Sequence, residues 1–201
     1  MSRFILGSQS PARLGLLRTA GFAPEVIVSG VDESGVTAPT VPALTRELAR
    51  LKAADVAARV EGEAYVLGCD SLLELDGRPL GKPEGAEEAV ARWKSMRGRS
   101  GVLHTGHCLI ETGTGRTLLE VASTTVRFAD VDDAEIAAYV ATGEPLWVAG
   151  AFTIDGYASP FIEGIDGDHG NVIGVSLPLL RRMFAELGVP VHTLWAVPGE
   201  A

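Results

Sequence analysis

The sequence has few cysteines, few histidines and no long apolar run. Of its 201 residues, only two are Cys and four are His. Cys69 and Cys108 are too few and too far apart for a disulfide framework or a thiolate zinc site, so we expect buried free thiols in a reducing compartment. Because no apolar run approaches about 18 residues, we expect neither a signal peptide nor a membrane span, and we expect a cytoplasmic protein.

Positive charge is also scarce. The chain has 17 Lys and Arg against 26 Asp and Glu, a formal net charge of −9. A general binder of nucleic acid or anionic membrane needs a basic face, so the balance argues against both partners. The apolar fraction of 46% with 21% charged residues is typical of globular chains and argues against disorder. The length suits one domain or two small lobes that share a core, and we expect a single domain over 1–201.

Apolar strands interspersed with amphipathic helices predict an α/β fold with a mixed sheet. Strands are expected over 3–7, 26–28, 65–75, 79–83, 102–111 and 117–128. Helices are expected from a Ser10 cap up to Gly21 and over 40–60, 86–97, 132–142 and 177–187. The segment 144–174 is dense in Gly and Asp, and we assign it no element.

Two near-motifs do not carry their usual chemistry. Gly77 to Pro83 resembles a P-loop, but it has three residues between its glycines and a Pro where Ser or Thr must reach magnesium. His104 and His107 are three apart on a predicted strand, where their side chains point to opposite faces, so we do not expect a zinc pair. With no Ser in a matching elbow, a hydrolase triad is poorly supported.

Single charged residues leave alternatives open. Asp70 interrupts an apolar run, where a carboxylate either caps a neighbouring turn or is paired or bound to metal in a site. Glu33, Lys52 and Lys82 are, taken singly, ordinary surface side chains.

The strand-to-helix turn that contains Ser8, Ser10 and Arg13 also has two interpretations. It is either a simple helix cap or a phosphate site, since a helix N-terminus offers free N–H groups and a positive dipole end.

Taken together, the order and spacing of these segments resemble the Maf family of nucleoside triphosphate pyrophosphatases, also called septum-formation proteins. The resemblance runs from about residue 4 to 187. The segments that carry it are 8–13 (SQSPAR), 31–33 (VDE), 52–53 (KA), 68–71 (GCDS), 81–83 (GKP), 141–145 (ATGEP), 149–156 (AGAFTIDG), 163–168 (EGIDGD), 171–174 (NVIG) and 177–178 (LP). Six or more ordered segments are far more specific than any one motif.

The resemblance implies an inosine-triphosphatase-like α/β fold, with a long, bent mixed sheet flanked by helices and a nucleotide cleft between two lobes. It also implies a homodimer. The implied activity is that of a nucleotide diphosphatase, which hydrolyses a nucleoside triphosphate between its α and β phosphates to the monophosphate and diphosphate, including non-canonical or modified nucleotides. The implied cofactor is a divalent cation, Mg²⁺, Mn²⁺ or Co²⁺.

The resemblance also implies roles for particular residues. Asp70 matches the general base for the attacking water, and Glu33 with Asp70 matches the metal ligands. Arg13, Lys52 and Lys82 match the cations around the triphosphate. Hydrolysis at phosphorus consists mostly of positioning and neutralising oxygens, so these residue types suit the reaction.

The resemblance also places Ser8, Ser10, Ser71 and Asp155 around the substrate. Three positions depart from the family pattern. Ala12 stands where the family often has the first of two arginines, and Ser71 replaces a common Thr. Asp155 replaces the Gln of members that prefer dTTP or UTP. An ionised carboxylate only accepts hydrogen bonds, so Asp155 predicts a preference for bases that present N–H donors.

An alternative function is a non-catalytic nucleotide-binding regulator of cell division and septum formation. Such a protein would bind nucleotide and release no pyrophosphate. The presence of Asp70, Glu33 and Lys82 argues against it, because a pure binder needs no base in its site.

Overall fold

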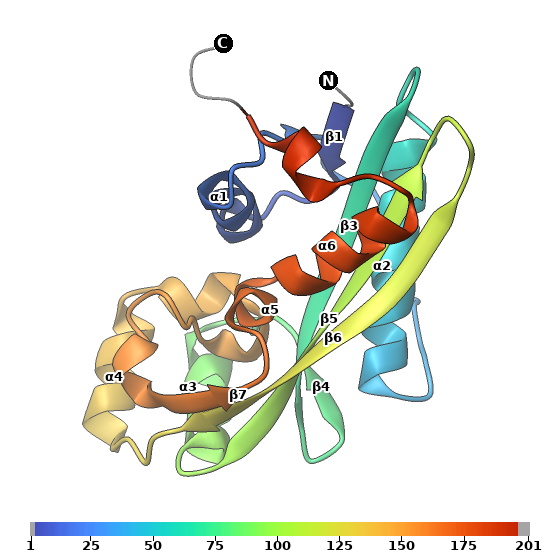
Figure 1. Ribbon diagram of the computed structural model, residues 1–201. Coiled ribbons are helices and arrows are strands. Elements are labelled where there is room, and N and C mark those ends of the chain that lie inside the picture. The colour runs from blue at the N-terminus through green and yellow to red at the C-terminus, as the bar shows by residue number, and fades with distance from the viewer. Residues whose placement is uncertain (1–2, 197–201) are drawn as a thin grey trace.

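The computed structural model describes residues 3–196 and shows one mixed sheet with helices on both faces (Figure 1). The strands are β1 (Arg3–Leu6), β2 (Glu25–Val26), β3 (Ala64–Leu75), β4 (Arg78–Leu80), β5 (Ser100–Glu111), β6 (Thr117–Phe128) and β7 (Ile162–Asp166). Their order in the seven-stranded sheet is β2-β1-β3-β5-β6-β7, with β4 paired to β3. β1 is parallel to β2 and β3, whereas the other pairs are antiparallel, which confirms the mixed sheet.

The helices are α1 (Pro11–Thr19), α2 (Val41–Ala57), α3 (Ala86–Met96), α4 (Asp133–Ala141), α5 (His169–Ile173) and α6 (Leu177–Glu186). Short 3₁₀ turns are η1 (Glu144–Trp147), η2 (Ala149–Ala151), η3 (Ser159–Phe161) and η4 (Val191–Leu194). None of the helices between residues 3 and 196 is long and apolar enough to cross a membrane.

Two large apolar cores lie at opposite ends of the long strands. One packs α1 and α6 on β1, β3 and β5, with Phe4 and Phe184 among its buried side chains. The other packs α3 and α4 on the far ends of β3, β5 and β6, around Trp93 and Phe128. Because β3, β5 and β6 run through both (Figure 1), the two halves of the molecule share one sheet.

Helix α2 lies unusually close to the opposite face of the sheet because the strands carry glycine beneath it. A Cβ at Gly68 of β3 would lie 2.5 Å from the Ala49 carbonyl oxygen, and one at Gly106 of β5 would overlap the Thr45 carbonyl. Any side chain at either position would push the helix away. The glycines therefore set the depth at which the α2 side chains meet the sheet.

Several local predictions are confirmed. Asp76 and Gly77 both have positive φ, as the tight β3–β4 hairpin requires. Ser10 caps α1, and Asp132 with Glu135 forms the expected capping box of α4. The cysteines are free and buried.

Three segments differ from the predictions. The strand expected over 26–28 is only the pair Glu25–Val26, because β1, with which it pairs, ends at Leu6. The strand expected over 79–83 is Arg78–Leu80, and beyond it the Gly81 carbonyl accepts from the Gly150 backbone N–H. The segment 144–174 is not a simple loop, since it contains β7 and α5. β7 is short and interrupted by Gly164, where a Cβ would collide with Arg127 of β6, so pairing with β6 rather than an apolar pattern defines it.

Candidate active site

The candidate site lies at an open stretch of the β3 edge. β1 pairs with Ala64–Leu67 of β3, and β4 pairs with Leu73–Leu75, so that no strand between residues 3 and 196 joins the edge from 68 to 72 on this side. Asp70 and Ser71 lie in this gap. Being consecutive, they leave opposite faces of the strand and meet different helices.

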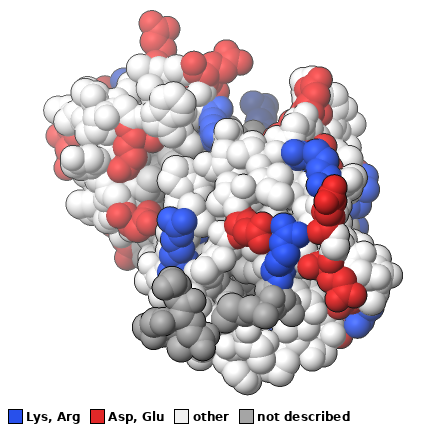
Figure 2. Space-filling model, turned by 90° about the horizontal axis from the view of Figure 1, so that it is seen from above, with Lys and Arg blue, Asp and Glu red and all other residues white. Residues whose placement is uncertain are grey.

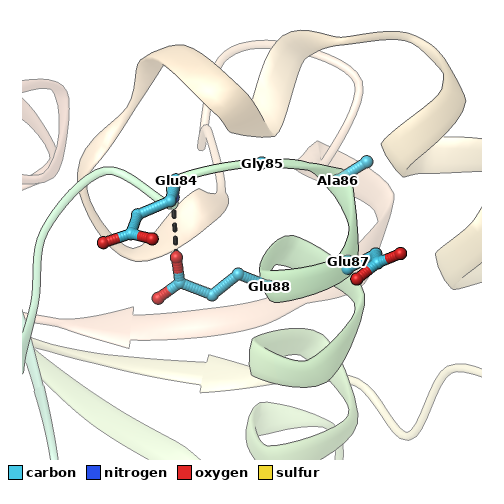
Figure 3. A pocket seen from close by; sticks show the side chains of 5 residues that line it. All are labelled: Glu84, Gly85, Ala86, Glu87 and Glu88. Atoms are coloured by element: carbon cyan, nitrogen blue, oxygen red, sulfur yellow. Dashed lines mark hydrogen bonds between the residues drawn. The ribbon is translucent and has the colours of Figure 1, made fainter.

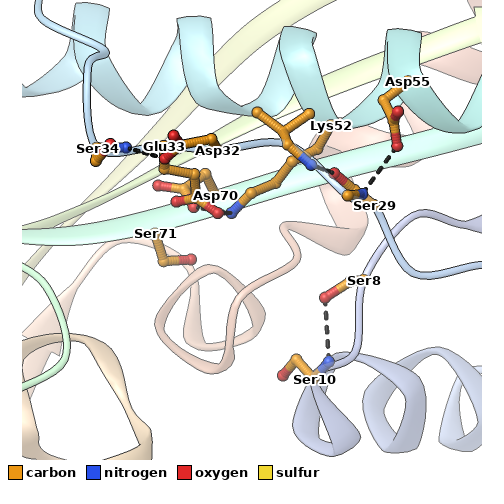
Figure 4. A network of polar contacts seen from close by, with 12 residues as sticks. Ser8, Ser10, Ser29, Asp32, Glu33, Ser34, Lys52, Asp55, Asp70 and Ser71 are labelled. Carbon is orange, nitrogen blue, oxygen red and sulfur yellow. Dashed lines mark hydrogen bonds and ion pairs between the residues drawn. The ribbon is translucent and has the colours of Figure 1, made fainter.

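On the α2 side, one ammonium group joins two carboxylates (Figure 4). Lys52 Nζ lies 2.5 Å from Asp70 Oδ1 and 2.9 Å from Glu33 Oε1. The Asp70 side chain is 10% exposed and that of Glu33 is 45% exposed, so Lys52 connects an interior carboxylate to one that faces solvent. The close packing of α2 on Gly68, two residues before Asp70, places Lys52 within reach.

Burial raises the pKa of Asp70 above its ordinary value, and the Lys52 ammonium opposes part of that rise. A carboxylate with a raised pKa is a stronger base than a solvated one. Asp70 Oδ1 accepts from Lys52, which leaves Oδ2 without a hydrogen bond from the described residues and available to a water molecule.

On the other face, the Arg13 guanidinium is held at three points. Nε donates to the Gly174 carbonyl at 3.0 Å, one terminal nitrogen donates to Ser8 Oγ at 3.1 Å, and the other donates to Ser71 Oγ at 2.9 Å. Gly174 is required here, because a Cβ would lie 2.8 Å from Arg13 Nε. The guanidinium is therefore fixed beside the N-terminus of α1 rather than free in solvent.

Ser10 acts as the α1 cap: its Oγ accepts from the Arg13 backbone N–H at 3.4 Å. Its own backbone N–H donates to Ser8 Oγ at 3.2 Å. Figure 4 shows Ser8 and Ser10 together at the start of α1 and Ser71 next to Asp70 on β3. The cap interpretation is therefore confirmed, and the phosphate site stays a prediction.

Lys82 and Asp155 are not brought into this cluster by contacts. Both are exposed, and among the described residues neither side chain makes a hydrogen bond or an ion pair. Lys82 follows β4 next to Gly81, whose carbonyl accepts from the Gly150 backbone N–H at 3.0 Å. Both residues therefore belong to the half of the molecule that contains α3 and α4.

The loop that carries Asp155 is organised by Glu144. Its carboxylate accepts from Tyr139 Oη at 3.0 Å, from Thr153 Oγ1 at 2.5 Å and from the Tyr157 backbone N–H at 3.0 Å. These hydrogen bonds hold the pKa of Glu144 below its ordinary value against the effect of burial. Sequence reasoning did not single out Glu144, whose three donors come from separate segments.

The residues present suit a divalent cation shared with a substrate. Among residues 3–196, no group of three or more His, Cys, Asp or Glu side chains could hold a metal by itself. Mg²⁺, however, is commonly held by one or two carboxylates plus phosphate oxygens and water. Glu33 and Asp70, drawn together by one ammonium, form such a partial oxygen donor set.

The face of the molecule seen in Figure 2 does not suggest a second anion site. The face in Figure 2 shows Lys and Arg interspersed with Asp and Glu, so no single sign covers it. A hollow at the start of α3 is lined by Glu84, Gly85, Ala86, Glu87 and Glu88 (Figure 3). Its three carboxylates would repel a triphosphate.

Known families and proteins match nearly the whole chain. The family model described as Maf-like protein matches residues 3–187. The chain belongs to the Maf-like family. Proteins named nucleoside triphosphate pyrophosphatase are close Maf-like relatives: one from Streptomyces coelicolor is 65% identical over 96% of this chain and 95% of its own length, and one from Gloeothece citriformis is 53% identical over 96% and 97%.

More distant proteins share the fold of this Maf-like chain. The solved structure of the Staphylococcus aureus Ham1 protein matches with a TM-score of 0.54 at 14% identity, covering 92% of this chain and 100% of the other. At that identity the likeness concerns the fold alone. It confirms the expected α/β architecture with a mixed sheet flanked by helices.

Proposed function

We propose that this chain hydrolyses nucleoside triphosphates between the α and β phosphates, releasing a nucleoside monophosphate and diphosphate. The observation that carries the proposal is the open edge of β3, where Asp70, Lys52 and Glu33 meet on one face and Arg13, Ser8 and Ser71 on the other. The names of the Maf-like relatives support the same reaction.

In this proposal, Asp70 is the general base. Its Oδ2 accepts the proton of a water molecule while Lys52 holds Oδ1 in place. The raised pKa of Asp70 suits this role, since a base works best when its pKa approaches the operating pH. Arg13, Lys52 and Lys82 neutralise phosphate oxygens, and Ser8, Ser10 and Ser71 surround the α1 end of the site.

Glu33 and Asp70 would hold a divalent cation together with the phosphates. Bound there, the cation would supply charge neutralisation at the phosphate oxygens and a more acidic water. Because the chain has a net charge of −9 and its site contains two carboxylates, we propose strong dependence on the cation. The carboxylates alone would oppose binding of a triphosphate.

Asp155 is proposed to contact the base. Its carboxylate accepts hydrogen bonds only, so it favours bases with an exocyclic amino donor, such as guanine or cytosine, over uracil or thymine, whose single N–H lies between two carbonyl acceptors. Modified and non-canonical triphosphates are proposed substrates as well. The homodimer and the cytoplasmic location stay predictions, which gel filtration and cell fractionation would test.

The product distinguishes this proposal from its alternatives. Phosphate is measured with malachite green, with and without added inorganic pyrophosphatase, over a panel of canonical and modified triphosphates with Mg²⁺, Mn²⁺ or Co²⁺. We expect colour only when pyrophosphatase is present. Nucleotide binding without any product would instead support the non-catalytic regulator of cell division, and colour without pyrophosphatase would indicate cleavage at another phosphoanhydride.

A further inference from the structure

A row of hydroxyl groups continues inward from Arg13. Ser71 Oγ lies 2.9 Å from Thr105 Oγ1, and Thr105 Oγ1 donates to the Asn171 backbone carbonyl at 3.1 Å. Ser71 and Thr105 are direct cross-strand partners on β3 and β5. Thr105 is fully buried, so it cannot contact a substrate itself.

The direction of each hydrogen bond follows from the number of hydrogens available. A hydroxyl carries one hydrogen, a carbonyl carries none, and a guanidinium has no acceptor. Thr105 gives its hydrogen to Asn171, so it must accept from Ser71. Ser71 therefore donates inward to Thr105 while accepting from Arg13, and its hydrogen is not available to a phosphate.

Ser8 differs from Ser71 in this respect. Its Oγ accepts from Arg13 and from the Ser10 backbone N–H, and its hydrogen goes to no acceptor among the described residues. Of the two hydroxyls that hold Arg13, Ser8 is thus the one left to donate to a bound oxyanion.

We infer that Ser71 and Thr105 are positioning residues, which aim the Arg13 guanidinium through a one-way hydrogen-bond relay ending on α5. Helix α5 and its C-cap accept the hydrogen bonds at both ends of the relay. The Gly174 carbonyl accepts directly from Arg13 Nε, and the Asn171 carbonyl accepts from Thr105 Oγ1. The consequence for catalysis rests on the proposed function. It changes the expected role of Ser71 from a substrate contact to a support for Arg13.

The chain offers a matched control for the buried hydroxyl. Thr45 of α2 is also fully buried, and its Oγ1 also donates to a backbone carbonyl, that of Pro42, at 2.9 Å. Its hydroxyl makes no hydrogen bond with Ser71, Arg13 or Asn171. Thr45→Val therefore removes the same kind of hydrogen bond as Thr105→Val without breaking the relay.

The test measures kcat/KM for Thr105→Val, Thr105→Ser, Thr45→Val, Ser71→Ala and the double variant Ser71→Ala with Thr105→Val. We expect Thr105→Val and Ser71→Ala each to lose about 10- to 100-fold, because small displacements of a phosphate-binding group are costly. Thr105→Ser and Thr45→Val should stay within about twofold. The double variant should lose no more than the worse single variant, since groups acting as one unit are not additive.

A second readout does not depend on turnover. The ¹⁵N–¹H signal of Arg13 Nε, assigned with Arg13→Lys, should exchange faster with solvent in Thr105→Val and keep its wild-type rate in Thr45→Val. If wild-type protein released no pyrophosphate, the proposed function would fail while this signal still tested the relay. Unchanged exchange of the Arg13 Nε signal in Thr105→Val would overturn the relay. Additive losses of kcat/KM, which would make the double variant far worse than Ser71→Ala alone, would overturn it too.

Discussion

The two halves of the candidate site differ in how far the protein organises them before any ligand binds. Around β3, Lys52, Asp70, Arg13 and Ser71 are all held by hydrogen bonds or ion pairs. In the other half, the Lys82 and Asp155 side chains are exposed and make no such contact with the described residues, although Glu144 pins the loop that carries Asp155. Groups that act on the reacting bond gain most from preorganisation, whereas groups that contact the rest of the nucleotide can be exposed side chains that are not held in advance.

The largest effect should come from the preorganised half. Asp70→Asn keeps the size of the side chain and removes the proposed base, so we expect kcat to fall by about 10²-fold or more with folding intact. The measurements are steady-state pyrophosphate release and thermal unfolding. Asp76→Asn, at an exposed turn of the same hairpin, is the control and should retain activity. Near-normal turnover in Asp70→Asn would remove Asp70 as the base.

A pair of lysine variants tests the contrast between the halves. Lys52→Met and Lys82→Met should each lower kcat/KM by about 10²-fold, because each removes a cation from the triphosphate. Only Lys52→Met should also lower the free energy of unfolding, by about 3 kcal/mol, since it leaves the buried Asp70 carboxylate without its partner. Denaturant unfolding measures this difference. Equal stability of the two variants would contradict a preorganised β3 side.

The preorganised half should also contain a group that makes the free energy of unfolding sensitive to acid. His107 is fully buried, its Nε2 accepts from the Ser176 backbone N–H, and burial lowers its pKa from 6.5 to about 4. Between pH values of about 4 and 6.5, the unfolded chain therefore binds a proton at His107 that the folded chain does not bind. His107 should lower the free energy of unfolding by about 1.4 kcal/mol for each pH unit as pH falls from about 6.5 to about 4.

Unfolding in denaturant across this pH range measures the slope. His107→Gln removes the titrating ring and should give a flatter profile, whereas His192→Gln, at an exposed position, should follow the wild type. If His107→Gln kept the wild-type slope, other groups would account for the acid sensitivity.

The smallest effect is expected for Asp155, whose side chain is exposed. Asp155→Gln should shift the ratio of kcat/KM for uracil or thymine nucleotides against guanine nucleotides by about tenfold in favour of the former, because Gln can both donate and accept. Stability should not change, since Asp155 makes no contact with the described residues. A nucleotide panel and a melting curve check both statements, and an unchanged base preference would remove Asp155 from the base site.

The sequence predicts much of the fold and offers the candidate site residues, but it does not show how those residues are supported. Alternation predicts β5 and β6, and a lone Asp in an apolar strand singles out Asp70. Thr105 gives no such signal, since its role depends on a cross-strand partner and on α5, which is five residues long and too short for a helical pattern. Glu144 is missed for the same reason: its donors meet only after folding.

The most direct test of the central claim is the ³¹P NMR spectrum of a nucleoside triphosphate turned over by wild-type protein and by Asp70→Asn in parallel, with Mg²⁺ present. The account predicts equal amounts of monophosphate and diphosphate with the wild type, and almost no conversion with the variant. A spectrum showing nucleoside diphosphate and phosphate, or equal conversion by both proteins, would contradict cleavage between the α and β phosphates at a site centred on Asp70.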